Sequence, residues 1–168
     1  MLDEPDIVLG NPDCVIATWR STCIAVWRLH TRVDALLQLE TVFRRQSAMY
    51  KSLAVLQILE PTVRPLDSEQ RAALEQAMRS CSAIASSAVV YEGTGFQAAA
   101  VRAVVAGVAT LRRHPFPHQV FAEVGKAADF HAQHLRQPPG FRDGLLSATQ
   151  RVREWQSGSP GEELNNPV

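Results

Sequence analysis

The chain has almost no lysine and no excess of either charge. Lys51 and Lys126 are its two lysines, so nearly all of its positive charge is arginine. The 17 basic residues balance 17 acidic ones, and the formal net charge is zero. General binding to nucleic acid depends on a strong basic excess. The balance therefore argues against a general nucleic-acid binder.

Long hydrophobic runs are also lacking. A membrane-spanning helix needs about 20 apolar residues, but the most apolar segment, after Gly95, is interrupted by Gln97 and Arg102. The N-terminal sequence MLDEPDIVLG is acidic and lacks the charged-then-apolar order of a signal peptide. We therefore expect a cytoplasmic protein with no integral membrane segment.

Cysteine is scarce and irregularly spaced. Cys14, Cys23 and Cys81 are odd in number, and none of them belongs to a CxxC pair. Zinc ribbons and thioredoxin-like sites use such pairs, so both readings fail. We expect three reduced and mostly buried thiols, and we predict neither a metal nor a cofactor.

Hydrophobic periodicity predicts a hairpin followed by alternating helices and strands. Two β-rich runs, 14–19 and 23–27, are separated by a short connection, which is typical of a β-hairpin, and 7–9 reads as an optional edge strand. The remaining expected elements, in chain order, are a helix at 31–47, a strand at 52–59, a helix at 69–82, a strand at 88–91, a helix after Gly95 that runs to Leu111, a strand at 118–122, and helices at 124–135 and 143–155.

This order predicts an α/β fold with a small mixed sheet. Strands joined through helices pair in parallel by right-handed connections, and the N-terminal hairpin adds an antiparallel element. With about four to five helices, the expected organisation is an arm or edge strand at 1–13, an α/β domain at 14–137, an amphipathic helix at 141–156 and a disordered tail at 157–168. The amphipathic helix could pack on its own domain or on a second chain.

The segment 83–111 is the poorest in polar residues. A strand and a helix that are apolar on nearly every face are typical of a central strand with a helix packed against it, so we expect both in the core. Trp19 and Trp27 suit a half-buried sheet face. Phe116, between two prolines, is read as a plug that closes one end of the core; contact with a partner or a membrane surface is the alternative.

Two helix starts carry capping signals. Thr31, three residues before Asp34, is expected to cap the first helix. Asp67 and Gln70 have the spacing of a capping box, so the second helix should begin directly after Asp67 or Ser68.

The best local candidate for a ligand site is the glycine turn, which comprises Glu92, Gly93, Thr94 and Gly95. It joins the end of a strand to the start of a helix, where free backbone N–H groups can hold an anion. The turn lacks the third glycine of a dinucleotide fingerprint, and no phosphate-binding P-loop motif is present. Turn geometry with close helix–strand packing is the competing explanation.

Histidines offer a weaker alternative. His131 and His134 share a helix face, and with His114 and His118 a metal site is conceivable. No acidic or cysteine partner stands at a telling spacing, so we interpret them as surface histidines. The chain also lacks a GxSxG nucleophile elbow, and we expect no enzyme activity.

The element order resembles that of STAS domains, the fold of bacterial anti-sigma-factor antagonists, over roughly 14–135. In that family an Asp-Ser-Ser-Gly segment opens the second helix, and one of its serines is phosphorylated. Val63, Leu66, Asp67 and Ser68 fit the hydrophobic spacing and the Asp-Ser of that segment.

Three positions depart from the family pattern. Glu69 stands where the usual phosphoacceptor would be, Gln70 replaces the glycine, and Leu59 replaces an acidic residue that is common at the strand end. A glutamate there supplies a fixed negative charge, weaker than that of a phosphate. The segments EGTGF and HPFPHQVFAEVGKAADF look like those of uncharacterised bacterial STAS- or SEC14-like proteins.

The resemblance implies a regulatory or scaffolding protein that acts through a protein partner such as a kinase, an anti-sigma-like protein or a scaffold component. The expected partner or switch surface is the DSE corner, which comprises Asp67, Ser68 and Glu69, with Ser68 as the residue that could be phosphorylated. The alternative is a carrier or sensor that holds a small apolar or anionic ligand at the glycine turn. A homodimer is a further expectation, through the hairpin edge or the helix at 143–155.

Overall fold

The structure, a computed structural model, describes residues 3–111 and 114–156. The predicted disordered tail at 157–168 lies outside the described residues. The elements follow the expected order: β1 Asp6–Gly10, β2 Cys14–Trp19, β3 Thr22–Trp27, α1 Val33–Met49, β4 Leu53–Leu59, α2 Ser68–Arg79, β5 Ile84–Val90, α3 Gly95–Leu111, β6 His118–Phe121, α4 Val124–Leu135 and α5 Phe141–Glu154.

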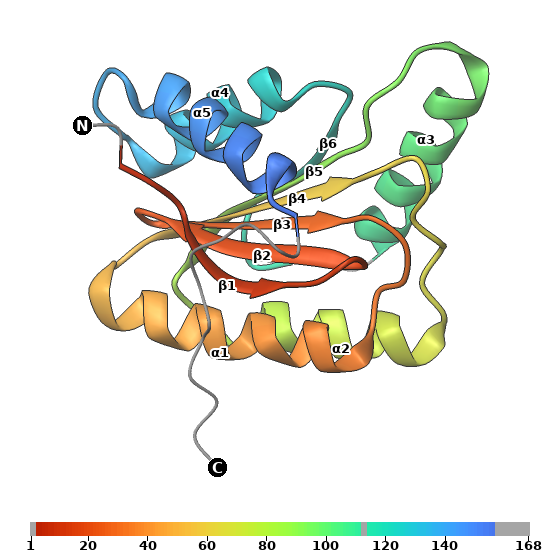
Figure 1. Cartoon of the computed structure of the whole chain (residues 1–168), viewed down its shortest axis with the longest axis horizontal. Coiled ribbons are helices and arrows are strands. Elements are labelled where there is room, and N and C mark those ends of the chain that lie inside the picture. Colours follow the sequence, from red (N-terminus) through yellow and green to blue (C-terminus); the bar gives the residue numbers. More distant parts are fainter. Residues whose placement is uncertain (1–2, 112–113, 157–168) are drawn as a thin grey trace.

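One six-stranded mixed sheet organises the molecule, with the strands side by side in chain order (Figure 1). β1, β2 and β3 pair antiparallel, while β3 to β6 are all parallel. The predicted hairpin is thus confirmed, as is the α/β class. Since parallel strands end on one side, the loops that leave β3, β4 and β5 share what we call the carboxyl edge of the sheet.

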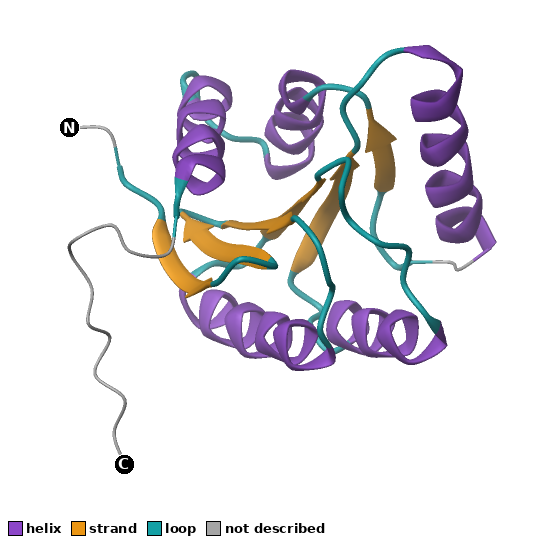
Figure 2. Cartoon of the chain, turned by 45° about the vertical axis from the view of Figure 1, so that its right-hand side comes forward, coloured by secondary structure: helices purple, strands orange, loops and turns teal. Residues whose placement is uncertain are grey.

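Helices cover both faces of the sheet. α1 and α2 lie below it and α4 and α5 above it in Figure 1, whereas α3 stands to the side, next to β6 (Figure 2). Each face therefore has its own hydrophobic core. Among the described residues, no helix is both long enough and apolar enough to span a bilayer.

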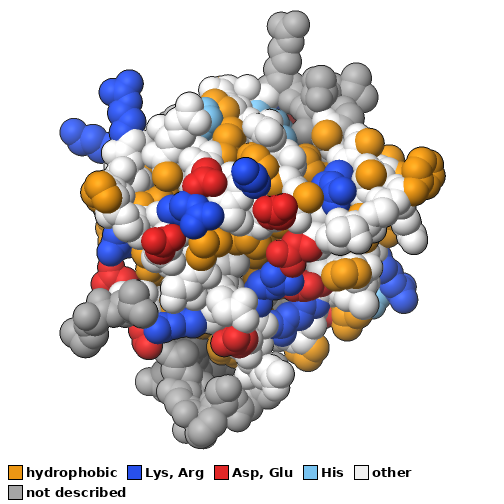
Figure 3. Space-filling view, turned by 90° about the horizontal axis from the view of Figure 1, so that it is seen from above, with side chains coloured by type: hydrophobic (Ala, Val, Ile, Leu, Met, Phe, Trp, Pro, Cys, Tyr) orange, Lys and Arg blue, Asp and Glu red, His pale blue; other side chains and the backbone are white. Residues whose placement is uncertain are grey.

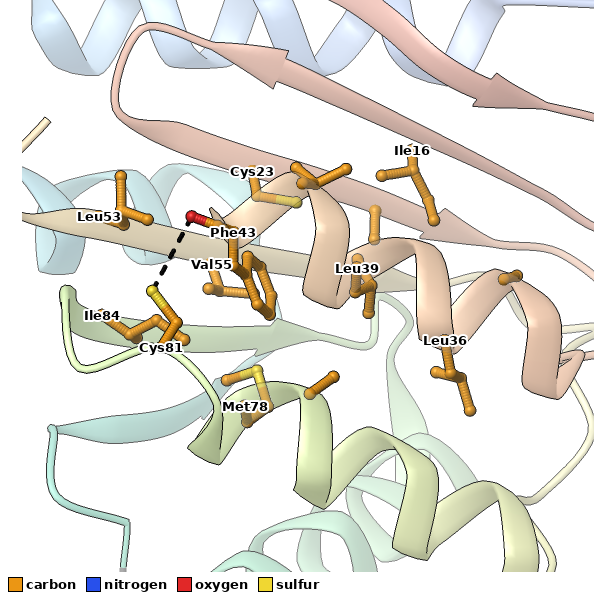
Figure 4. Close-up of a cluster of buried hydrophobic side chains, with 14 of the residues drawn as sticks. Ile16, Cys23, Leu36, Leu39, Phe43, Leu53, Val55, Met78, Cys81 and Ile84 are labelled. Atoms are coloured by element: carbon orange, nitrogen blue, oxygen red, sulfur yellow. Dashed lines mark hydrogen bonds between the residues drawn. The ribbon is translucent and has the colours of Figure 1, made fainter. Parts of the chain in front are cut away.

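The lower core joins the sheet to α1 and α2 (Figure 4). Phe43 of α1 and Leu53 of β4 are almost completely buried, and the Cys81 thiol lies 3.9 Å from the Phe43 carbonyl oxygen. All three cysteines are free and buried, as expected. Phe116 is 7% exposed and belongs to this core, which confirms its role as a plug.

The upper core joins the other sheet face to α4 and α5. Trp19 of β2 packs against Phe141 of α5, with ring centroids 5.4 Å apart. Phe141, Leu145 and Val152 of α5 are essentially inaccessible. The helix predicted near 143–155 therefore packs on its own sheet through these residues.

The placement of α3 corrects the sequence prediction. β5 is buried as expected, but α3 packs against β6 at the end of the sheet. Among the α3 side chains that the structure describes, 95–106, Ala98 is buried and none belongs to either hydrophobic core. Phe96 is 91% exposed and Val104 is 68% exposed. Alanine-rich composition makes a helix apolar without requiring burial, because alanine has little side-chain surface to remove from water.

The first helix also begins later than predicted. The residue at its N-cap is Arg32, without a side-chain cap, and Thr31 is buried at 5% exposure instead of capping. Asp34 instead accepts a hydrogen bond from the Ala35 backbone N–H and pairs with Arg32. The spacing of Thr31 and Asp34 therefore predicted the wrong N-cap, because the Thr31 side chain is buried.

Candidate functional site

The DSE corner lies where the loop from β4 enters α2, at the carboxyl edge. Asp67 Oδ1 accepts a 2.8 Å hydrogen bond from the Gln70 N–H, and Gln70 Oε1 accepts one of 2.8 Å from the Asp67 N–H. The predicted capping box is confirmed, and Asp67 is the N-cap. These reciprocal bonds satisfy two backbone donors and fix the start of the helix.

All three side chains of the DSE corner are exposed. Within the part of the chain that the structure describes, the Ser68 hydroxyl and the Glu69 carboxylate have no hydrogen-bond or ion-pair partner. Arg71 donates a 3.2 Å hydrogen bond to the Leu66 carbonyl, which holds a cation beside the helix start. Hydrogen bonds therefore hold the backbone of the corner, and its three side chains are exposed to solvent.

The glycine turn lies at the same edge, between β5 and α3. Gly93 and Gly95 have φ angles of 123° and 90°, which residues with a Cβ rarely adopt. Arg102 of α3 donates to the carbonyls of Tyr91 (3.0 Å) and Gly93 (3.1 Å). The turn is therefore held by its own helix, and its glycines are explained by their backbone angles, since a Cβ at Gly95 would have no neighbour within 4 Å.

Glu92, the acidic member of the turn, is held by α5. Arg153 lies 2.8 Å from Glu92 and 3.1 Å from Glu60, the residue that directly follows β4. Burial disfavours the charged guanidinium, but the hydrogen bond to Glu92 and the charge of Glu60 outweigh it, so the pKa of Arg153 is raised. One cation thus links the loops that follow β4 and β5.

A second arginine fixes the end of α5. Arg28, directly after β3, donates to the carbonyl oxygens of Arg153 (2.8 Å) and Trp155 (2.9 Å). The Trp155 ring lies against Gly10 at the end of β1. The final turn of α5 is therefore anchored along the carboxyl edge from β1 to β5. The sequence pattern did not reveal these contacts because the partners lie far apart along the chain, with Glu60 93 positions and Arg28 125 positions from Arg153.

The two predicted sites share an edge but not a contact. β4 and β5 are parallel, with Ile58 opposite Val90, so their carboxyl ends lie side by side. Across the residues described, no hydrogen bond or ion pair joins the DSE corner to the glycine turn. Arg153, which pairs with Glu60 and Glu92, joins the loops that leave β4 and β5.

The histidines are placed differently from the prediction. His131 is completely buried, and its Nδ1 lies 2.8 Å from Ser86 Oγ; it is not a surface histidine. His118 Nδ1 lies 3.0 Å from Ser87 Oγ. Burial lowers the pKa of His131 to about 3 and that of His118 to about 4, so both are neutral at pH 7.

The contacts of His134 and of the Ser86–His131 pair lie within the protein. His134 Nδ1 lies 2.8 Å from the Phe130 carbonyl, away from His131 Nδ1 and its serine. Among the residues described, no cluster of three or more histidine, cysteine or acidic side chains could hold a metal ion. Ser86 and His131 are both inaccessible to solvent, so this pair cannot meet a substrate in the present fold.

Comparison with models of known protein families, with curated proteins and with solved structures returned no match to this chain.

Proposed function

We propose that this chain is a non-catalytic regulatory or scaffolding protein of the STAS type, which acts by binding another protein through the DSE corner. The observation that carries the proposal is that the DSE corner has a hydrogen-bonded backbone and exposed, unbonded side chains. A reciprocal capping box fixes the backbone of Asp67, while Ser68 and Glu69 point unengaged polar groups to solvent. A partner can therefore bind these side chains without first breaking an internal contact.

The chemistry of the corner also suits a charge switch. A phosphate on Ser68 would lie at the N-terminus of α2, where the helix dipole favours negative charge. Arg71 reaches back to this turn, while Asp67 and Glu69 would oppose the added charge. Phosphorylation would therefore alter the potential that a partner meets, with little change in the fold.

The class of partner follows from the resemblance in sequence. A kinase, an anti-sigma-like protein or a scaffold component would recognise a helix start with exposed hydroxyl and carboxylate groups. The burial of Ser86 with His131 supports a non-catalytic role, because this serine–histidine pair is inaccessible to a substrate.

Site-specific photo-crosslinking tests this proposal. A photoreactive amino acid replaces Glu69 in the full chain, expressed in the cells from which the sequence comes. Gln133, exposed on α4 on the opposite face of the sheet, is the matched control position. We expect one discrete protein adduct from position 69 and none from position 133. Equal adducts from both positions, or none from either, would contradict the proposal.

The alternative function is a carrier or sensor for a small ligand at the glycine turn. The exposure of Gly93, Thr94 and Gly95 at the start of α3 favours it, because the first N–H groups of a helix lack partners within the helix. Native mass spectrometry of the purified chain decides this case. A bound small molecule that is lost on Gly95→Ala substitution supports a carrier, and a clean mass of the chain alone counts against it.

A further inference from the structure

A small cavity lies at the amino edge of the sheet, where β4 and β5 begin, opposite the carboxyl edge with the two predicted sites. The second half of α1 contributes Glu40, Arg44 and Ser47, and the connection from α2 to β5 contributes 80–83. The α1 residues are spaced by four and three positions, so they lie on one face of the helix. The cavity volume is about 150 Å³, which suits a ligand fragment of about six non-hydrogen atoms.

Two hydroxyl groups of the cavity have their protons engaged in hydrogen bonds to the backbone. Ser47 Oγ and Ser80 Oγ each donate to the carbonyl oxygen three residues earlier in the chain, over 2.9 Å and 2.7 Å. The Cys81 thiol likewise points to the Phe43 carbonyl oxygen, 3.9 Å away (Figure 4). A serine hydroxyl has one proton and two lone pairs. These oxygens therefore offer the cavity hydrogen-bond acceptors.

The fixed charges around the cavity favour a cation. Both α1 and α2 end here, at Met49 and Arg79, and the carboxyl end of a helix carries a partial negative charge. The last turn of α1 reads QSAM and brings no charge of its own, while Arg79 pairs with Glu75 at 2.7 Å. Glu40 adds a carboxylate whose side chain is 26% exposed.

Arg44 is the cation of the lining, and it holds the place that a cationic ligand would take. Its Nη2 lies 3.2 Å from Glu40 Oε1, but its side chain is 75% exposed. An ion pair so open to water contributes little to stability, so Arg44 can turn to solvent at small cost. A cationic ligand can therefore replace Arg44 as the partner of Glu40.

Selection by this cavity depends on its own groups, because the molecule has no net charge to attract one kind of ion. The formal net charge is zero, and acidic and basic side chains are interspersed on the face seen from above (Figure 3). At 0.1 M salt, exposed charges more than about 10 Å away are screened. The Glu40 carboxylate, the serine oxygens and the two helix ends therefore decide what binds.

We propose that the amino-edge cavity binds the ammonium end of a short alkylamine. The three N–H donors of such a group meet the Glu40 carboxylate, Ser47 Oγ and Ser80 Oγ, and the adjoining methylene groups pack on Ala83. The same chemistry occurs in free diamines and at the end of a lysine side chain. The site is separate from the DSE corner, so this proposal and the proposed function can fail independently.

A proton–nitrogen correlation NMR titration of the full chain measures binding at the cavity. We expect 1,4-diaminobutane to shift the amides of Ser47 and 80–83 with a dissociation constant of about 1 mM, because so small a ligand gains limited affinity. The uncharged 1,4-butanediol should bind at least about tenfold more weakly. Equal binding of the diol, shifts with sodium phosphate instead, or no saturable shift up to about 20 mM diamine would overturn the proposal.

A second titration separates the two sources of the ammonium group. Its probe is the tripeptide acetyl-glycyl-lysyl-glycinamide, which carries one lysine and no free terminus. Tighter binding of the diamine assigns the site to a free amine, and tighter binding of the peptide assigns it to a lysine of another protein. Either result supports an ammonium site, whereas binding of neither probe contradicts it.

Charge substitutions test the sign of the site. Glu40→Gln should weaken diamine binding about tenfold, because the ammonium loses its carboxylate partner. Glu75→Gln is the matched control, since Glu75 forms the same kind of ion pair with an arginine four positions later, is 23% exposed and does not line the cavity. Arg44→Met should tighten binding about twofold, because a competitor for Glu40 is removed.

Filling the cavity tests its location. Ser47→Leu places a larger apolar side chain in the cavity and should abolish diamine binding, whereas Ala48→Leu, at the next exposed position of α1, should bind like the wild type. Both positions are exposed, so the spectra of both variants should show an intact fold. Equal binding by the two leucine variants, or weaker binding on Arg44→Met with no change on Glu40→Gln, would overturn the proposal.

Discussion

The guanidinium of Arg153 lies 2.8 Å from the carboxylate of Glu92, so the last turn of α5 holds the loop in front of α3. The same guanidinium pairs with Glu60 at 3.1 Å, after the neighbouring strand. Arg153 and Glu60 are only about a quarter exposed. This pairing ties a C-terminal helix to both strand ends that lead into the predicted sites.

Arg153→Met should lower the free energy of unfolding by about 1 to 2 kcal/mol, because two half-buried carboxylates lose their common partner. Urea denaturation measures the change. Arg151→Met is the matched control on the same helix, since its partner Glu4 is 81% exposed, and it should cost less than about 0.5 kcal/mol. Equal losses in the two variants would show that the ion pairs of Arg153 with Glu60 and Glu92 contribute no more to the free energy of unfolding than an exposed pair does.

Glycine at position 144 is expected to be required by packing. A Cβ there would lie 2.6 Å from the Trp19 ring, which is buried and packed against Phe141. Overpacking at so short a contact should cost about 3 kcal/mol, from which the ~1 kcal/mol that alanine gains over glycine in a helix is subtracted, so Gly144→Ala should destabilise the fold by about 2 kcal/mol. Thermal unfolding measures the outcome.

Gly125 of α4 provides the contrast. A Cβ there would meet only Nη2 of Arg142 at 3.2 Å, the far end of a flexible and partly exposed side chain. Gly125→Ala should be neutral or stabilise by up to ~1 kcal/mol. If Gly144→Ala were as stable as Gly125→Ala, the close contact between Trp19 and α5 would be wrong.

Asp67→Ala should remove the capping box of α2. Alanine cannot accept the hydrogen bond from the Gln70 N–H, so we expect a loss of about 1 kcal/mol of stability. Ser68→Ala is the neighbouring control and should change stability by less than about 0.5 kcal/mol, because the Ser68 side chain is exposed and unbonded. A loss of similar size in both variants would indicate that Asp67 does not act as the cap.

Acid should destabilise the protein through its buried histidines. The folded-state pKa of His131 is lowered to about 3, first by burial and then by the charge of His134, whereas an unfolded histidine titrates near 6.5. The unfolded chain therefore binds the proton first. The contribution of neutral His131 to the free energy of unfolding is fully present above about pH 6.5. It is lost progressively as the pH falls toward 3, by roughly 2 kcal/mol between pH 7 and 5.

His131→Gln should remove that share of the pH dependence, as measured by urea unfolding at pH 7 and pH 5. His118→Gln should remove a second share, because burial and the charge of His114 lower the pKa of His118 to about 4. If His131→Gln unfolded with the same difference between the two pH values as the wild type, the proton linkage would have to lie elsewhere.

The sequence was sufficient for the features that depend on local pattern. Apolar runs separated by turns identified the strands, and the parallel order follows because a helix lies between successive strands. The capping box of Asp67 and Gln70 was predicted because its partners are three positions apart. The glycine turn was placed correctly between β5 and α3, since its spacing also reflects local backbone geometry.

The features that the sequence did not reveal depend on contacts between residues far apart in the chain, or on which side chains become buried when the helices pack on the sheet. Arg153 meets Glu60 and Glu92 only after α5 has folded over the sheet. His131 was expected at the surface because it is polar. The sequence does not show that Ser86, 45 positions away, provides a buried hydrogen-bond partner for it. The helix α3 was expected in the core because composition does not distinguish a buried helix from one beside the last strand.

The central claim is that the DSE corner binds a protein, and the affinity of the crosslinked partner for Ser68→Asp tests it most directly. Titration calorimetry with that partner should show binding at least tenfold weaker than for the wild type, because a new charge enters the contact. Gln133→Asp on the opposite face should bind like the wild type. Undiminished binding by Ser68→Asp, in a chain that remains folded, would contradict the claim.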